Sequence, residues 1–141
     1  MLYIVILILM ESDIHKDELM CIDDNIRIIN EFFANLKIAG RSDKTIKKYG
    51  LDIKNLIDFL NNKPVTEITA NEIKYYLAWY QQNRSISNTT LEGMRLTFCS
   101  FFNWLESEDY ILKSPVRKIK PIKKDTQPER ELYANEIEQL K

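Results

Sequence analysis

Residues 87–105 restrict the fold most strongly, because their apolar side chains recur with the period of an α-helix. At 3.6 residues per turn they form one broad stripe of Leu91, Met94, Phe98, Phe101, Phe102 and Leu105. Ser87 stands where it can cap the first turn, and Asn88, Glu92 and Arg95 share one flank near it. Free backbone N–H groups and the helix dipole favour an anion at this end. The pattern predicts a helix that is anchored in a core and offers its polar N-terminal end to a phosphate or a base edge.

Earlier segments show the same helical period, and they predict helices at residues 25–39, 42–61 and 70–83. Gly40 supplies the stop of the first, Ser42 caps the second, and Thr69 with Glu72 forms a capping box at the third. The acidic stretch at residues 11–24 reads as irregular. With only three glycines and four prolines in 141 residues, long stretches free of both favour an all-α bundle of four to five helices in one domain.

A basic connector interrupted by prolines follows the last of these helices. We expect Tyr110, Ile111 and Leu112 to fold back onto the core, and Pro115, Pro121 and Pro128 to prevent a long helix. Residues 132–141 begin an amphipathic helix of about two turns, which is too short to be stable alone. We therefore divide the chain into an extension (residues 1–24), a helical body (25–112), a linker (113–131) and the start of a truncated further domain (132–141).

The N-terminal run at residues 2–10 is apolar but is too short to span a bilayer, and acids follow it rather than a cleavage site. We interpret it as neither a signal peptide nor an anchor. A misassigned start site, with Met10 or Met20 as the true first residue, is another explanation of this apolar run. Cys21, Cys99 and a single histidine are too few for a disulfide framework or a zinc site. We expect a cytoplasmic protein with no metal, cofactor or small-molecule substrate.

The distribution of charge favours a polyanionic partner although the total does not. The net charge is −1, yet residues 1–40 carry seven acids and three bases, so the remaining residues have a net charge of +3. The local potential steers a polyanion. The basic side chains of the connector occur without an intervening acid and are Lys113, Arg117, Lys118, Lys120, Lys123 and Lys124.

Each group of basic or aromatic residues has two readings. Lys44, Lys47 and Lys48 in the first turns of the second predicted helix either meet phosphates or form an ordinary solvated face. The connector either tracks a phosphate backbone or is a solvated linker. The aromatic residues of the third predicted helix either form a platform for base stacking or belong to the core and its rim. We favour the core and its rim for Tyr75, Tyr76, Trp79 and Tyr80.

The order of these elements resembles the N-terminal core-binding domain of tyrosine recombinases, the phage integrase family. The residues that support this are Ser42-x-x-Thr45-x-x-x-Tyr49, Ile68-Thr69-x-x-x-Ile73, Thr90-Leu91 followed by the segment at residues 100–105, and the segment at residues 106–119. The last of these is similar to integrases of bacterial mobile elements. The resemblance covers about residues 26–140 and implies a SAM-like helical bundle that clamps duplex DNA together with a catalytic domain.

The resemblance also implies which residues contact DNA. On the second helix the candidates are Lys44, Thr45, Lys47 and Lys48, and at the start of the fourth predicted helix they are Ser87, Asn88, Thr89, Thr90 and Arg95. Arg95 is the expected base reader, because a guanidinium can contact guanine with two hydrogen bonds. The sequence departs from the family at Leu96, where a second basic residue is common, and at Tyr133, where a capping Ser or Thr is usual.

The family's chemistry passes through a covalent 3′-phosphotyrosine, with its catalytic groups in the domain that would begin near residue 132. None of those groups can be assigned here, so we expect no strand cleavage from this polypeptide alone. The sequence leaves two functions open: a DNA-binding module of a recombinase, with other recombinase protomers as possible partners, and a helical protein-interaction or regulatory module. A small complete enzyme is disfavoured, because no nucleophile, base and orienting group can be assembled.

Overall fold

The computed structural model describes the backbone of residues 16–123 and the side chains of residues 24–123. Within that range the protein is all-helical and contains no strand. The α-helices are α2 (Lys16–Ile38), α3 (Asp43–Phe59), α4 (Ala70–Arg84) and α5 (Asn88–Ser107), and the two short 3-10 helices are η1 (Val65–Glu67) and η2 (Pro115–Lys118). The all-α fold predicted from the sequence is confirmed. The predictions for residues 1–15, for Lys124 and for the segment at 132–141 lie outside the described residues.

The helix starts of α3, α4 and α5 agree with the predicted caps. The side chains of Ser42 and Ser87 accept hydrogen bonds from the backbone N–H groups three residues on. Thr69 and Glu72 form the expected capping box. Each cap satisfies an N–H group that a helix start otherwise leaves without a partner.

The predicted start of the first helix was wrong, because α2 begins at Lys16 rather than near residue 25. The stretch that we read as irregular contains no glycine or proline between residues 16 and 24, and Asp17 and Glu18 stand in its first turn. Carboxylates near a helix N-terminus interact favourably with the helix dipole. Leu19 and Ile22 also continue the apolar period of Ile26 and Ile29 toward the N-terminus, which favours a helix over this stretch.

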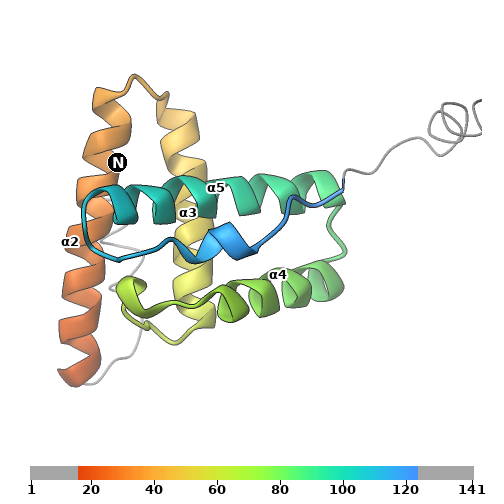
Figure 1. The fold of residues 1–141 in the computed structure, drawn as a ribbon, viewed down its shortest axis with the longest axis horizontal. Helices are drawn as coiled ribbons and strands as arrows, with labels where there is room; N and C mark the ends of the chain where they lie inside the picture. The colour runs from red at the N-terminus through yellow and green to blue at the C-terminus, as the bar shows by residue number, and fades with distance from the viewer. Residues whose placement is uncertain (1–15, 124–141) are drawn as a thin grey trace, which may run out of the picture.

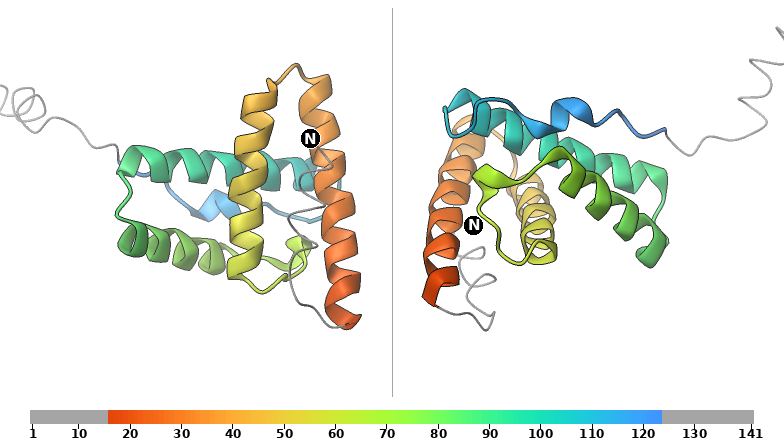
Figure 2. Two further views of the ribbon diagram at one scale, coloured as in Figure 1. Left: turned by 180° about the vertical axis from the view of Figure 1, so that it is seen from behind. Right: turned by 60° about the horizontal axis from the view of Figure 1, so that its bottom comes forward.

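The four helices form two layers that cross (Figures 1 and 2). In one layer α2 and α3 lie side by side and run antiparallel. In the other layer α4 and α5 run antiparallel across α3, and η2 packs against both of them. The N-terminal end of α5 therefore lies next to the C-terminal end of α4, at the opposite end of the layer from α2.

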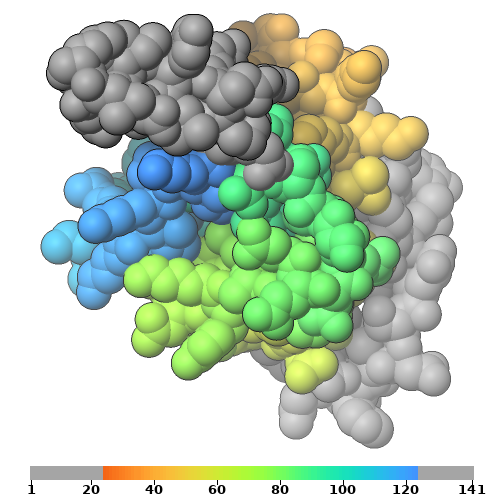
Figure 3. Space-filling view, turned by 90° about the vertical axis from the view of Figure 1, so that its right-hand side faces the viewer, coloured from red at the N-terminus to blue at the C-terminus, as the bar shows by residue number. Residues whose placement is uncertain are grey.

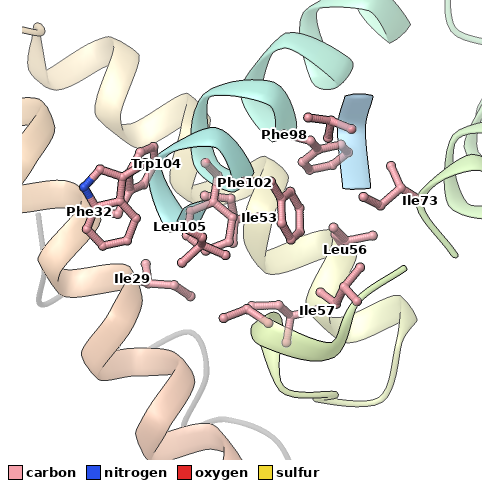
Figure 4. Close-up of a cluster of buried hydrophobic side chains, with 14 of the residues drawn as sticks. Ile29, Phe32, Ile53, Leu56, Ile57, Ile73, Phe98, Phe102, Trp104 and Leu105 are labelled. Atoms are coloured by element: carbon pink, nitrogen blue, oxygen red, sulfur yellow. The ribbon is translucent and has the colours of Figure 1, made fainter. Parts of the chain in front are cut away.

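The core lies between these layers and is built around α5 (Figure 4). All six residues of its predicted apolar stripe are buried. The rings of Phe32 and Phe101 lie 5.1 Å apart between centroids, and those of Phe32 and Trp104 lie 5.3 Å apart. These aromatic contacts join α2 to the C-terminal half of α5, so burial of one face of α5 holds the two layers together.

The first half of the predicted linker is part of the folded body. Val116 and Ile119 are buried in the core, and Ser114 caps η2. The carboxylate of Glu106 accepts a hydrogen bond from the Ser114 N–H at 2.8 Å and another from the Arg117 guanidinium. Within residues 113–123 the chain forms only the short η2, as expected from Pro115 and Pro121, while Pro128 lies outside the described residues. The connector packs along α5 instead of leaving the bundle at residue 113.

The residues before the connector agree only partly with the sequence prediction. Tyr110 and Ile111 are partly buried against the core, as expected. Leu112 was expected to fold back with them, but its side chain is fully exposed. The turn at Asp109, which has a φ of 64°, sends the chain back along α5 and leaves Leu112 on the outside.

None of the helices in the described part of the chain is both long and apolar enough to cross a membrane.

We predict that Asn25→Ala destabilises the fold by about 1–3 kcal/mol. The buried Asn25 side chain donates to the Lys63 carbonyl oxygen and accepts from the Val65 N–H, each at 3.0 Å, so its removal leaves two inner backbone groups without partners. Urea unfolding followed by circular dichroism measures this. The exposed Asn103→Ala serves as the control and should change stability by less than about 0.5 kcal/mol. Equal losses for the two variants would contradict the assigned role of Asn25.

We also predict that the contribution of Glu106 to stability depends on pH. The Arg117 guanidinium and the Ser114 N–H hold the pKa of Glu106 below its ordinary value of 4.5. A lowered folded-state pKa means that the stabilisation is present above the unfolded-state value and is lost as the pH falls through the folded-state value. The difference in unfolding free energy between the wild type and Glu106→Gln should therefore be largest near neutral pH and shrink below about pH 4. A difference that stays constant over this range would contradict the assignment.

Candidate nucleic-acid interface

Lys48 joins α3 to α5 where the two helices cross. Its ammonium group lies 2.7 Å from Asp52 Oδ2, 3.3 Å from Thr97 Oγ1 and 3.4 Å from the carbonyl oxygen of Gly93. The buried Thr97 hydroxyl donates to the same Asp52 oxygen at 2.7 Å. Lys48, which was predicted to contact DNA, therefore links α3 to α5 through hydrogen bonds. Its side chain is still half exposed.

The other predicted residues of α3 lie in its first two turns. Lys44 and Lys47 are exposed, and within residues 24–123 no acidic side chain pairs with them. Because Lys44 lies about one turn before Lys48, it shares the face of α3 that meets α5. The hydroxyl of Thr45 accepts a hydrogen bond from Ser42 Oγ at 3.0 Å, so this side chain supports the cap.

The N-terminal end of α5 is exposed and well fixed. Ser87 Oγ accepts from the Thr90 N–H at 3.1 Å, and Asn88 Oδ1 accepts from Gln81 Nε2 of α4 at 2.8 Å. Thr89 and Thr90 are exposed. Three of the predicted residues, Ser87, Asn88 and Thr90, thus hold the helix start in place, and Thr89 lies on its outer surface.

Arg95 does not lie with the lysines of α3. It stands about half a turn around α5 from Gly93 and Thr97, which are the residues that contact Lys48. Only 7% of Arg95 is exposed. Its Nε and Nη2 atoms donate to the two Glu92 carboxylate oxygens, each at 2.8 Å, and this pairing raises its pKa. In this structure the expected base reader has no free guanidinium edge to offer.

The remaining predicted residues belong to the connector. Lys113, Lys118, Lys120 and Lys123 are exposed, and no acid within residues 24–123 forms an ion pair with Lys118, Lys120 or Lys123, whereas the charge of Lys113 acts on Glu106. Arg117 is exposed as well but is bound to Glu106. Lys124 lies outside the described residues.

The lysines of α3 and those of the connector lie on two sides of α5. Figures 1 and 2 show α3 behind α5 and η2 in front of it, and Figure 3 shows the connector and α3 separated by the N-terminal half of α5. Lys48 contacts α5 at Gly93 and Thr97, in its second and third turns, and the connector lies on the opposite flank of the helix. The N-terminal half of α5 therefore stands between the two basic groups.

The aromatic residues of α4 are divided between core and rim, as we favoured from the sequence. Tyr76 is buried, Tyr80 is partly buried, and Tyr75 and Trp79 are exposed. Burial raises the pKa of Tyr76. The ring of Trp79 packs against that of Phe59 with 5.4 Å between centroids. The rings of Tyr76, Trp79 and Tyr80 contact one another, and a hollow of about 280 Å³ lies beside them.

Sequence reasoning missed two carboxylates that organise the connector. Glu92 Oε1 accepts a hydrogen bond from the backbone N–H of Ile122 at 2.8 Å, and Glu106 binds the other end of the connector. Both acids lie on α5, fourteen residues apart in the sequence. Their spacing is close to four whole turns, which places them on one flank of the helix. That periodicity was the only signal available, and it is weak without knowledge of the connector's path.

The other reactive or ligating side chains within residues 24–123 include the thiol of Cys99. Cys99 is partly buried, and burial raises the pKa of its thiol, which makes the reactive thiolate less available. The side chains described at residues 24–123 contain no group of three His, Cys, Asp or Glu residues that could hold a metal ion.

Comparisons with known proteins agree with this fold. The family model for the phage integrase N-terminal SAM-like domain matches residues 28–112, which is more than half of the chain. Neither the curated proteins nor the solved structures contain a match. The matched range includes α3, α4, α5 and about half of α2, and thus the crossing at Lys48, but it does not include η2, whose Val116 is part of the core. The chain belongs to the family of phage integrase N-terminal SAM-like domains and has a role related to tyrosine recombinases.

Proposed function

We propose that this chain is the DNA-binding module of a site-specific tyrosine recombinase and that it contacts duplex DNA through α3, α5 and the connector. The observation that carries the proposal is the crossing of α3 and α5 at Lys48, which fixes the lysines of α3 along the N-terminal half of α5. Exposed lysines and the free backbone N–H groups at a helix start are each suited to phosphate groups. Membership of the integrase family supports the same conclusion.

The charges on this surface support phosphate binding rather than a purely structural role. Lys44 and Lys47 are exposed and lack acidic partners within residues 24–123, so their full charge is available to a ligand. Lys48 already contacts Asp52. Its contribution to DNA binding should be smaller, because part of its charge is balanced within the protein.

Base recognition would fall to the outward face of α5 rather than to Arg95. The exposed positions Thr89, Leu96 and Asn103 lie on that face. Leu96 is 50% exposed, and an apolar side chain there can contact a thymine methyl group but cannot donate a hydrogen bond. We therefore expect modest sequence preference from this module alone, with affinity dominated by phosphate contacts.

The proposed role is binding without bond breaking. In the family, strand cleavage belongs to a catalytic domain, and no catalytic group of that kind can be assigned in this chain. The polypeptide should hold duplex DNA and leave supercoiled plasmid intact.

A second function, protein interaction, has one supporting observation. A hollow of about 380 Å³ lies between α2 and the C-terminal end of α5, lined by Glu31, Ala34, Asn35, Ile38, Trp104 and Glu108. Exposed Ile38 and the two carboxylates suit a basic partner segment with an apolar side chain. Salt-insensitive or absent binding to duplex DNA would favour this function.

We predict that Lys44→Ala combined with Lys47→Ala weakens binding to random-sequence duplex DNA. Fluorescence anisotropy at several salt concentrations gives the slope of log K against log salt. Each lost phosphate contact should reduce that slope by about 0.9, so the double variant should lose about 1.8. Lys74→Ala, an exposed lysine on α4, is the matched control and should leave the slope unchanged. If Lys74→Ala lowered the salt slope by half as much as the double variant does, the effect per lysine would be the same everywhere, which would contradict a defined interface.

The connector lysines make a separate prediction. Lys118→Ala and Lys120→Ala should each lower the salt slope by about 0.9 and weaken binding equally for unrelated sequences, because phosphate contacts carry no sequence information. The same anisotropy titration with two unrelated duplexes measures both effects. If neither substitution changed the slope of log K against log salt, the connector would not contact DNA.

A further inference from the structure

We propose that Glu92 and Arg95 form a latch that fixes the connector to α5 and thereby positions the connector lysines for DNA. This inference rests on the proposed DNA-binding function and deepens it. It gives Arg95 a positioning role in place of the base-reading role that its sequence position indicated. The pair would act on DNA only through the segment that it holds.

The geometry of the pair points to a carboxylate that is held ready for a backbone group. Both hydrogen bonds from Arg95 to Glu92 are 2.8 Å long, and the two side chains are only 9% and 15% exposed. Nη1 of Arg95 also contacts Cys99 Sγ at 3.2 Å. With its orientation fixed in this way, Glu92 Oε1 accepts the Ile122 N–H at 2.8 Å. An ion pair oriented by two parallel hydrogen bonds is geometrically well defined.

The latch is one of two attachments at the ends of the connector. At the other end, Glu106 accepts the Ser114 N–H and binds Arg117. Between these points Val116 and Ile119 are buried in the core. The connector is thus held by a carboxylate at each end and by two apolar side chains in the middle. A helix rise of 1.5 Å per residue separates the two carboxylates by about 21 Å along α5.

The consequence for DNA binding is that the connector lysines occupy set positions before a ligand arrives. Lys118 and Lys120 lie between the two attachments, and Lys123 directly follows the latch. In a free linker these side chains would have to be ordered on binding, at a cost in conformational entropy. Here folding of the domain has already ordered their backbone. Pairing with Arg95 also balances the negative charge of Glu92, which would otherwise repel a nearby phosphate.

The test uses the full chain with three latch variants and one control. Glu92→Ala removes the carboxylate, and Glu92→Gln keeps an oxygen that can accept the Ile122 N–H but removes the ion pair. The double variant Glu92→Leu with Arg95→Met removes both charges together, which avoids a buried unpaired guanidinium that could unfold the domain. Exposed Glu67→Ala is the control for loss of one negative charge.

Hydrogen exchange and DNA binding are then measured on each variant. We expect the Ile122 amide to exchange at least ten times faster in Glu92→Ala and in the double variant, while amides in the middle of α4 keep their protection. The salt slope should fall by about 0.9 to 1.8 in these two variants although every lysine is still present, since the contacts of one or two connector lysines would be lost. Glu92→Gln should fall between them and the wild type, and Glu67→Ala should keep the wild-type slope.

Three outcomes would overturn the inference, and they are distinguishable from one another. Faster exchange at Ile122 with an unchanged salt slope would show that the latch does not position the lysines for DNA, and the proposed function would stand. If the wild type itself shows no salt-dependent binding, the DNA-binding function fails together with the inference. A uniform loss of protection throughout the bundle in the double variant would mean that the pair supports the fold as a whole, which would also overturn a local positioning role.

Discussion

Burial of the apolar face of α5 is the constraint on which the rest of the structure depends. Its residues contact both α2 and α3, and its ring contacts with Phe32 link the two layers. Because this one helix is held along its length, its two flanks become fixed surfaces. One flank meets α3 at Lys48, and the other holds the connector through Glu92 and Glu106. Each part of the candidate interface is placed by its relation to this helix.

The sequence predicted the positions of the helices better than it predicted which groups their side chains contact. Period and capping residues located α3, α4 and α5, because both signals are local. The start of α2 was missed because charged residues flank the short apolar run at residues 19–22 and obscure its helical period. The path of residues 113–123 was missed for another reason. Two buried side chains, Val116 and Ile119, determine it, and a proline-containing basic segment gives no local sign of where they pack.

The candidate site shows the same limit at the level of single residues. Lys44 and Lys47 are exposed as their positions on a helix predicted. Arg95 is not, because its role depends on the side chain beside it and on a backbone group that is 27 residues further along the chain. A sequence shows that an arginine lies near a helix start, but it does not show whether a neighbouring carboxylate already binds that arginine. Side-chain pairing of this kind is determined by tertiary structure.

The position of Val116 and Ile119 has a practical consequence for defining this domain. The family match ends at residue 112, but the folded unit continues for about ten residues, because these two side chains fill space between α4 and α5. A fragment cut at residue 112 would expose the apolar side chains that Val116 and Ile119 cover, and it would leave Glu106 without its backbone partner. Such a fragment would tend to associate with itself through this exposed apolar surface. The folded module therefore extends at least to Ile122, which is the last residue in the described part of the chain that donates a hydrogen bond to α5.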